Sequence, residues 1–154
     1  MSASILSKQL EKVQRHYEAL REYKAYIDAT SFDFSIERFR ELDTPQKAVL
    51  DAYLKRFAAL QDYLGAKVFK SLLDASGIAY TKMSEVLTLI ESEGIISLDR
   101  WIEFRTIRND LEHDYPDELA EALQDLAYCV RHFDYMEQVV ADVMQFAERY
   151  GAHI

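Results

Sequence analysis

The scarcity of chain-reversing residues is the feature that most limits what this sequence can fold into. Its 154 residues include only four glycines and two prolines. A fold rich in β-strands needs more turn residues than that, so the sequence favours long helices. Hydrophobic residues make up 49% of the chain, which is ample for a packed interior. We therefore predict an all-α fold, with one domain spanning residues 1–154.

Apolar residues recur at steps of three and four along most of the chain, which indicates amphipathic helices. Thr44 and Pro45 mark the start of a long helix, with a capping hydroxyl and a proline in the first turn. Gly77 is well placed to end that helix. The short connections make neighbouring helices antiparallel, so we predict an antiparallel bundle of about five to six helices. The expected helices cover residues 3–28, 32–42 as a short helix, 44–76, a stretch that Thr81 caps and Gly94 ends, a stretch that begins at Leu98 and carries the motif, and 117–149.

The charge balance limits the range of functions. The formal net charge is −9, which argues against a general nucleic-acid coat protein because such proteins bind through many phosphate contacts. A small basic patch that acts on RNA, or a basic protein partner, remains compatible with it. The only cysteine, Cys129, cannot form an internal disulfide. No signal peptide or membrane span is evident, so we expect a cytoplasmic protein that does not enter the membrane.

The segment RNDLEHDYP, residues 108–116, concentrates the polar chemistry of the chain. On a helical wheel the residues around it separate into three sectors. A core sector holds Trp101, Phe104, Ile107, Leu111 and Tyr115. A solvated sector holds Asp99, Glu103, Asp110 and Asp114, and between the two lie Ile102, Arg105, Asn109 and His113. Arg108 lies at the border of the core sector, where Glu112, four residues later, is in reach of an ion pair with it.

Arg108 and His113 do not share a face of a regular helix. Five residues separate them by roughly 140° around the axis and about 7.5 Å along it. Two arrangements would bring them to one site. Either the helix unwinds before His113, which Pro116 encourages, or a second protomer completes the site. We favour the second arrangement, with Ile102 as a dimer contact.

These residue types suit cleavage of RNA without a metal. Histidine can take a proton from the 2′-hydroxyl or give one to the leaving oxygen, and arginine matches phosphate oxygens. Asn109 could orient the histidine or the phosphate. A structural interpretation stays open beside this one. A histidine near a helix C-terminus interacts favourably with the negative end of the helix dipole. An arginine at the border of the core can extend its charged end to solvent.

The residues Arg108, Asn109, His113 and Tyr115 match the Arg-x4-His-x-Tyr signature of the HEPN superfamily, and in particular of HepT-like toxins. The stretches RFAALQDYLGAKVFKSLLDASGI and LIESEGIISLDRWIEF also resemble the part that precedes the motif in such proteins. The resemblance covers most of residues 50–116.

The resemblance implies a homodimeric helical bundle with metal-independent endoribonuclease activity and no cofactor. It implies that Arg108 and His113 form the catalytic pair at a cleft between protomers, and we expect Asn109 and Arg105 to support them. It also implies a partner, a minimal nucleotidyltransferase (MNT-type) antitoxin that transfers AMP to Tyr115. A nucleotidylated phenol there would block the pocket with bulk and negative charge.

Two alternatives remain beside a ribonuclease toxin. One is a non-catalytic nucleotide- or substrate-binding partner subunit of a nucleotidyltransferase, and the other is a helical scaffold without a site. The remaining histidines, His16, His132 and His153, are isolated and lack the spacing of metal ligands. Cys129 is expected to be a small core residue.

Overall fold

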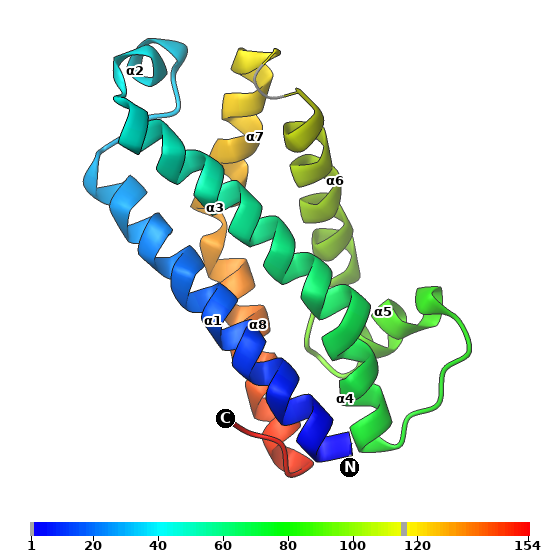
Figure 1. Cartoon of the computed structure of the whole chain (residues 1–154). Helices are drawn as coiled ribbons and strands as arrows, with labels where there is room; N and C mark the ends of the chain where they lie inside the picture. The colour runs from blue at the N-terminus through cyan, green and yellow to red at the C-terminus, as the bar shows by residue number, and fades with distance from the viewer. Residues whose placement is uncertain (1, 115–116) are drawn as a thin grey trace.

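The computed structural model describes residues 2–114 and 117–154, and this part of the chain is built from helices without any strand. The all-α prediction is therefore confirmed. Figure 1 shows the helices in chain order. They are α1 (Ser2–Ala29), α2 (Ile36–Glu41), α3 (Thr44–Tyr63), the π-helical turn η1 (Leu64–Val68), α4 (Phe69–Ser76), α5 (Met83–Ser92), α6 (Leu98–Asp114), α7 (Leu119–Arg131) and α8 (Phe133–Arg149).

The segments α3, η1 and α4 follow one another without a break, as the predicted helix over 44–76 requires. Its N-terminal cap differs from the prediction, because Asp43 and not Thr44 provides it. The Asp43 carboxylate accepts from the Gln46 amide, and the Gln46 side chain accepts from the Asp43 amide in return. The helix ends as predicted at Gly77, whose φ of 76° is the left-handed conformation that glycine adopts most readily.

The predicted cap of α5 is also wrong in detail. Thr81 does not cap this helix, which begins at Met83 and has Lys82 at its N-cap position. The hydroxyl and the backbone amide of Thr81 both donate to the Glu85 carboxylate. Thr81 therefore fixes the first turn through Glu85.

The predicted helix over residues 117–149 is two helices, α7 and α8, which meet at His132. Neither glycine nor proline lies at this break. Its sequence signal is two successive steps of three in the apolar row, from Val130 to Phe133 to Met136. Each such step falls about 60° short of a full turn, so a straight α-helix would carry Met136 out of the row. The break lets all three side chains stay buried.

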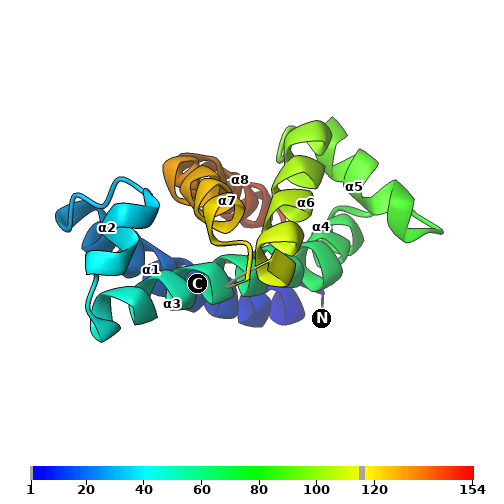
Figure 2. The ribbon, with the colours of Figure 1, turned by 90° about the horizontal axis from the view of Figure 1, so that it is seen from above.

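The helices form two layers. Seen from above, α1 and α3 lie side by side in one layer, and α6, α7 and α8 lie over them, with α2 and α5 at opposite ends (Figure 2). The core between the layers is aromatic at its centre, where Phe104 of α6 stacks on Tyr135 of α8 and lies close to Phe57 of α3. Within the described residues, no helix has both the length and the apolar character needed to cross a membrane.

Candidate functional site

Helix α6 presents the polar residues of the motif on its outer surface. Trp101, Phe104 and Leu111 are buried and hold the helix against α3 and α7. The intermediate sector of the helical wheel is exposed as predicted, and we call it the α6 strip. It consists of Ile102, Arg105, Asn109 and His113.

Arg108 lies at the border of the buried face of α6, about 60° around the helix from Arg105 and about 140° from His113, and is only 5% exposed. Its Nη1 donates to the Ala58 carbonyl at 2.8 Å, and its Nη2 pairs with the Asp62 carboxylate at 2.7 Å. The predicted pair with Glu112 is therefore replaced by one with Asp62 of α3. A buried guanidinium is stable only when its donors are satisfied, and both acceptors come from α3. Arg108 thus fastens α6 to α3.

One hydrogen-bond donor of the Arg108 side chain has no partner among the described residues. This donor is Nε, and Oε1 of Gln61, which is also buried, likewise has none. The amide of Gln61 uses its nitrogen to donate to the Trp101 carbonyl at 3.1 Å. Unpaired buried polar atoms cost free energy, so this contact between α3 and α6 is less well satisfied than the rest of the core.

The structure does not bring Arg108 and His113 together within one chain. Helix α6 continues through Asp114, so the predicted option of unwinding before His113 is wrong. Arg108 faces α3, whereas His113 is exposed at the end of the helix. Tyr115, the predicted site of nucleotidylation, lies outside the described residues.

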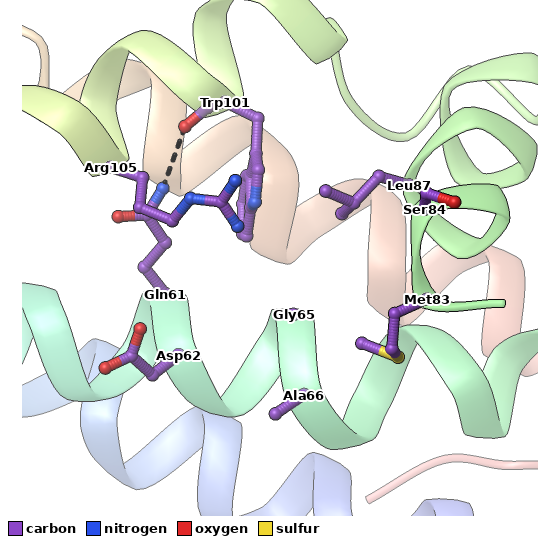
Figure 3. Close-up of a pocket in the computed structure, with 9 residues that line it drawn as sticks. All are labelled: Gln61, Asp62, Gly65, Ala66, Met83, Ser84, Leu87, Trp101 and Arg105. Carbon is purple, nitrogen blue, oxygen red and sulfur yellow. Dashed lines mark hydrogen bonds between the residues drawn. The ribbon is translucent and has the colours of Figure 1, made fainter.

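A hollow of about 410 Å³ lies beside the contact between α3 and α6 (Figure 3). Arg105 and Asp62 stand on opposite sides of one end of it, and Met83 and Leu87 of α5 form the other end. The π-helical turn forms part of its wall, where the Gly65 position lies close to the indole of Trp101. The full lining is Gln61, Asp62, Gly65, Ala66, Met83, Ser84, Leu87, Trp101 and Arg105.

Sequence reasoning missed Asp62. It lies one turn after Ala58, a small residue that lets α6 approach α3, but the row of apolar residues on α3 runs along another face. An acidic residue one turn from a small buried residue is only a weak sequence signal for an ion pair between helices. The motif on α6 gives no indication that Asp62 is the partner of Arg108. The structure makes Asp62 the charge partner of the motif arginine.

The remaining predicted candidates lie away from this site. Cys129 is fully buried, as expected, and burial raises the pKa of its thiol to about 12, so it is no nucleophile. His132 packs on Tyr128 and Phe104 at the break between α7 and α8, and His153 is exposed near the C-terminus. No group of histidine, cysteine and acidic side chains among the described residues could hold a metal ion.

Comparison of the chain with protein-family models, with curated proteins and with solved structures finds no match. The resemblance of the motif to HepT-like toxins therefore remains a prediction from the sequence.

Proposed function

We propose that the chain is a metal-independent endoribonuclease, the toxin of a toxin–antitoxin pair, which acts as a homodimer. The observation that supports this best is the α6 strip, in which an exposed imidazole, an amide and a guanidinium lie on one rigid helix. Because α6 stays helical through Asp114, one chain offers a single imidazole and no adjacent free guanidinium. The reaction needs both a base and an acid, so two copies supply the site.

In this dimer the two strips face each other, with the exposed Ile102 side chains as the apolar contact. His113 of one protomer takes the proton of a ribose 2′-hydroxyl, whose oxygen attacks the adjacent phosphate. The protonated imidazole of the partner's His113 gives a proton to the 5′-oxygen as its bond to phosphorus breaks. The products are a 2′,3′-cyclic phosphate and a free 5′-hydroxyl, so neither water nor metal is consumed.

The two arginines of the motif helix divide the remaining work. Arg105 is exposed and lies two turns before His113, about 12 Å along the helix, so it binds a neighbouring phosphate of the same strand. Arg108 holds α6 to α3 and so positions the strip. This role differs from the direct phosphate contact that the family resemblance implies for Arg108.

A cleavage assay tests the proposal. We expect the wild-type chain to cut single-stranded RNA in the presence of EDTA, to leave 2′,3′-cyclic phosphate ends, and to spare a 2′-deoxy substrate. His113→Ala should lower the rate about 10²–10⁴-fold, the usual contribution of a general acid or base. His153→Ala, which removes another exposed histidine, is the matched control. Equal cleavage rates for His113→Ala and the wild type would contradict the proposal.

The antitoxin belongs to the same proposal. An MNT-type nucleotidyltransferase silences the toxin by transferring AMP to Tyr115, two residues after the proposed acid–base group. Incubation with the nucleotidyltransferase and ATP should add one AMP mass per chain and abolish cleavage, and Tyr115→Phe should resist both changes. Mass spectrometry of the intact chain measures the modification directly.

A second candidate is a non-catalytic nucleotide-binding subunit of a nucleotidyltransferase. The neutralised Arg108 and the hollow between α3, α5 and α6 favour it, since about 410 Å³ lies within the range of small-molecule sites. Calorimetric titration with AMP separates the two. Tight binding that Leu87→Trp abolishes, together with no RNA cleavage by the wild type, would select this candidate.

A further inference from the structure

A cluster of positive charge lies where α1 packs against α3, away from the α6 strip. We call it the α1–α3 patch. Nη1 of Arg56 lies 3.0 Å from Nδ1 of His16, and the His16 ring lies 6.3 Å from that of Tyr63. The Lys12 ammonium lies over the Tyr63 ring, 4.5 Å from its centre. Two packed helices therefore bring one imidazole, one phenol ring and two cations into a connected group.

The charges that act on His16 are all positive. Burial is the main cause that lowers the pKa of His16, and the charges of Arg56, Lys12 and Arg15 lower it further. No carboxylate acts on His16 in the described part of the chain. The ion pairs found there are Lys24–Asp28, Arg38–Glu41 and Arg108–Asp62, so none of the three cations of the patch is neutralised in that way.

The hydrogen bond of Arg56 fixes the state of His16. Arginine has only donors, so Nδ1 of His16 must accept and the ring proton must lie on Nε2. His16 is thus a neutral imidazole that orients the guanidinium and leaves its charge intact. A carboxylate at this position would have made a stronger pair with Arg56 but would have cancelled that charge.

A cluster of cations is energetically unfavourable, and it is unexpected in a protein that is rich in acidic residues. Acidic residues outnumber basic ones by 27 to 18, so acidic partners for these cations are plentiful in the sequence. Three neighbouring cations also repel one another. The gathering of these cations around His16 and Tyr63, with only positive charges acting on His16, is the observation that points to an external anion.

We propose that the α1–α3 patch binds the phosphodiester backbone of single-stranded RNA. Lys12, Arg15 and Arg56 contact successive phosphates across the two packed helices, because cations in a row can follow the backbone of a single strand. The assignment of RNA as the anion rests on the proposed endoribonuclease function. The patch supplies the affinity that the α6 strip lacks, because Asp99, Glu103 and Asp110 place negative charge on the exposed face of α6 next to that strip.

The test uses the full chain and a fluorescent single-stranded RNA whose 2′-positions are methylated, so that binding is measured without cleavage. Lys12→Ala/Arg15→Ala removes two exposed charges without touching the core. We expect this variant to bind about tenfold more weakly or worse. The dependence of log affinity on log salt should become shallower by about 1.4, since each lost contact to a single strand accounts for about 0.7.

Arg40→Ala/Lys82→Ala is the matched control, because it removes two exposed charges far from the α1–α3 patch. It should bind RNA with the wild-type salt dependence. Equal thermal melting curves by circular dichroism would establish that all variants are folded.

The outcomes separate this inference from the proposed function. Cleavage by the wild type combined with wild-type RNA binding by Lys12→Ala/Arg15→Ala overturns the patch and leaves the ribonuclease intact. Loss of RNA binding in that variant supports the patch even if the wild type cuts no RNA. Equal RNA binding with a loss of affinity for polyglutamate would assign the patch to an acidic protein and overturn it as an RNA site.

Discussion

The guanidinium groups of Arg108 and Arg56 lie at two sides of helix α3, and the protein satisfies them in different ways. Arg108 is buried and bonds to one carboxylate and one backbone carbonyl. Arg56 is half-buried and bonds to a neutral imidazole in the company of two further cations. In the first arrangement the charge of Arg108 is neutralised by Asp62, and the pair joins two helices. In the second, the positive charge of Arg56 is not neutralised by the imidazole and remains at the surface. The motif arginine Arg108 therefore has a structural role. Lys12 and Arg15, in a part of α1 where the sequence carries no motif, keep charges that a ligand could bind.

The strongest test of this difference is the removal of the buried guanidinium. Arg108→Ala should lower the free energy of unfolding by about 2–4 kcal/mol, because it leaves a cavity and removes both hydrogen bonds that join α6 to α3. Arg105→Ala, on the exposed side of the same helix, should change it by less than about 0.5 kcal/mol. Urea unfolding followed by circular dichroism measures both. Similar values for the two variants would mean that Arg108 does not fasten α6.

Removal of the partner charge should have a smaller effect. Asp62→Asn keeps an acceptor oxygen for Arg108 but loses the negative charge, and we expect a loss of about 1–2 kcal/mol. The figure is below that for a fully buried pair because the Asp62 side chain is 64% exposed and water can replace part of the interaction. The same unfolding measurement in low and high salt checks it. Exposed Asp110→Asn, on α6, is the comparison variant.

The imidazole on the other side of α3 predicts a dependence on pH. The pKa of His16 is lowered in the folded protein, so between that pKa and the ordinary value of 6.5 the unfolded chain binds the proton more readily. The contribution of neutral His16 to stability is therefore present above about pH 6.5 and is lost as the pH falls below it. His16→Gln should lose less stability than the wild type between pH 7 and pH 5. Parallel stability curves for the two proteins would contradict this.

The smallest effect concerns Arg56 itself. Arg56→Gln should change the free energy of unfolding by no more than about 0.5 kcal/mol, because it removes a repulsive charge together with a hydrogen bond. It should raise the pKa of His16, since the charge of Arg56 helps to lower it. Proton NMR titration of the His16 ring signals measures the shift. No shift would mean that the charge of Arg56 does not help to lower the pKa of His16.

Much of the fold follows from patterns that act over one or two turns of helix. The apolar rows of α1 and of the long helix over 44–76, the end at Gly77 and the orientation of α6 were all predictable, because periodicity and glycine conformation are local properties. The break at His132 was missed. No breaker residue marks it, and only the spacing of Val130, Phe133 and Met136 records it.

The site was less predictable than the fold. Exposure of Arg105, Asn109 and His113 followed from the helical wheel, which needs no knowledge of the neighbours. The burial of Arg108 depended on Asp62 and Ala58, which lie 46 and 50 residues earlier, and no local rule connects them. The α1–α3 patch joins residues 40 or more positions apart for the same reason. Charge partners between helices are a property of the packing.

The π-helical turn at Leu64–Val68 limits how the length of this helix can change. The apolar row reaches Leu72 from Leu60 through Leu64 and Val68 in steps of four, and each step overshoots a full turn of α-helix by about 40°. The wider turn absorbs this excess and keeps all four side chains inside. Deleting one residue there would leave eleven residue steps from Leu60 to the Leu72 position, which turn through about 1100°, close to three full turns of regular α-helix, so the row would stay inside. Inserting one further residue would instead rotate α4 by about 100° and turn its apolar side away from the interior.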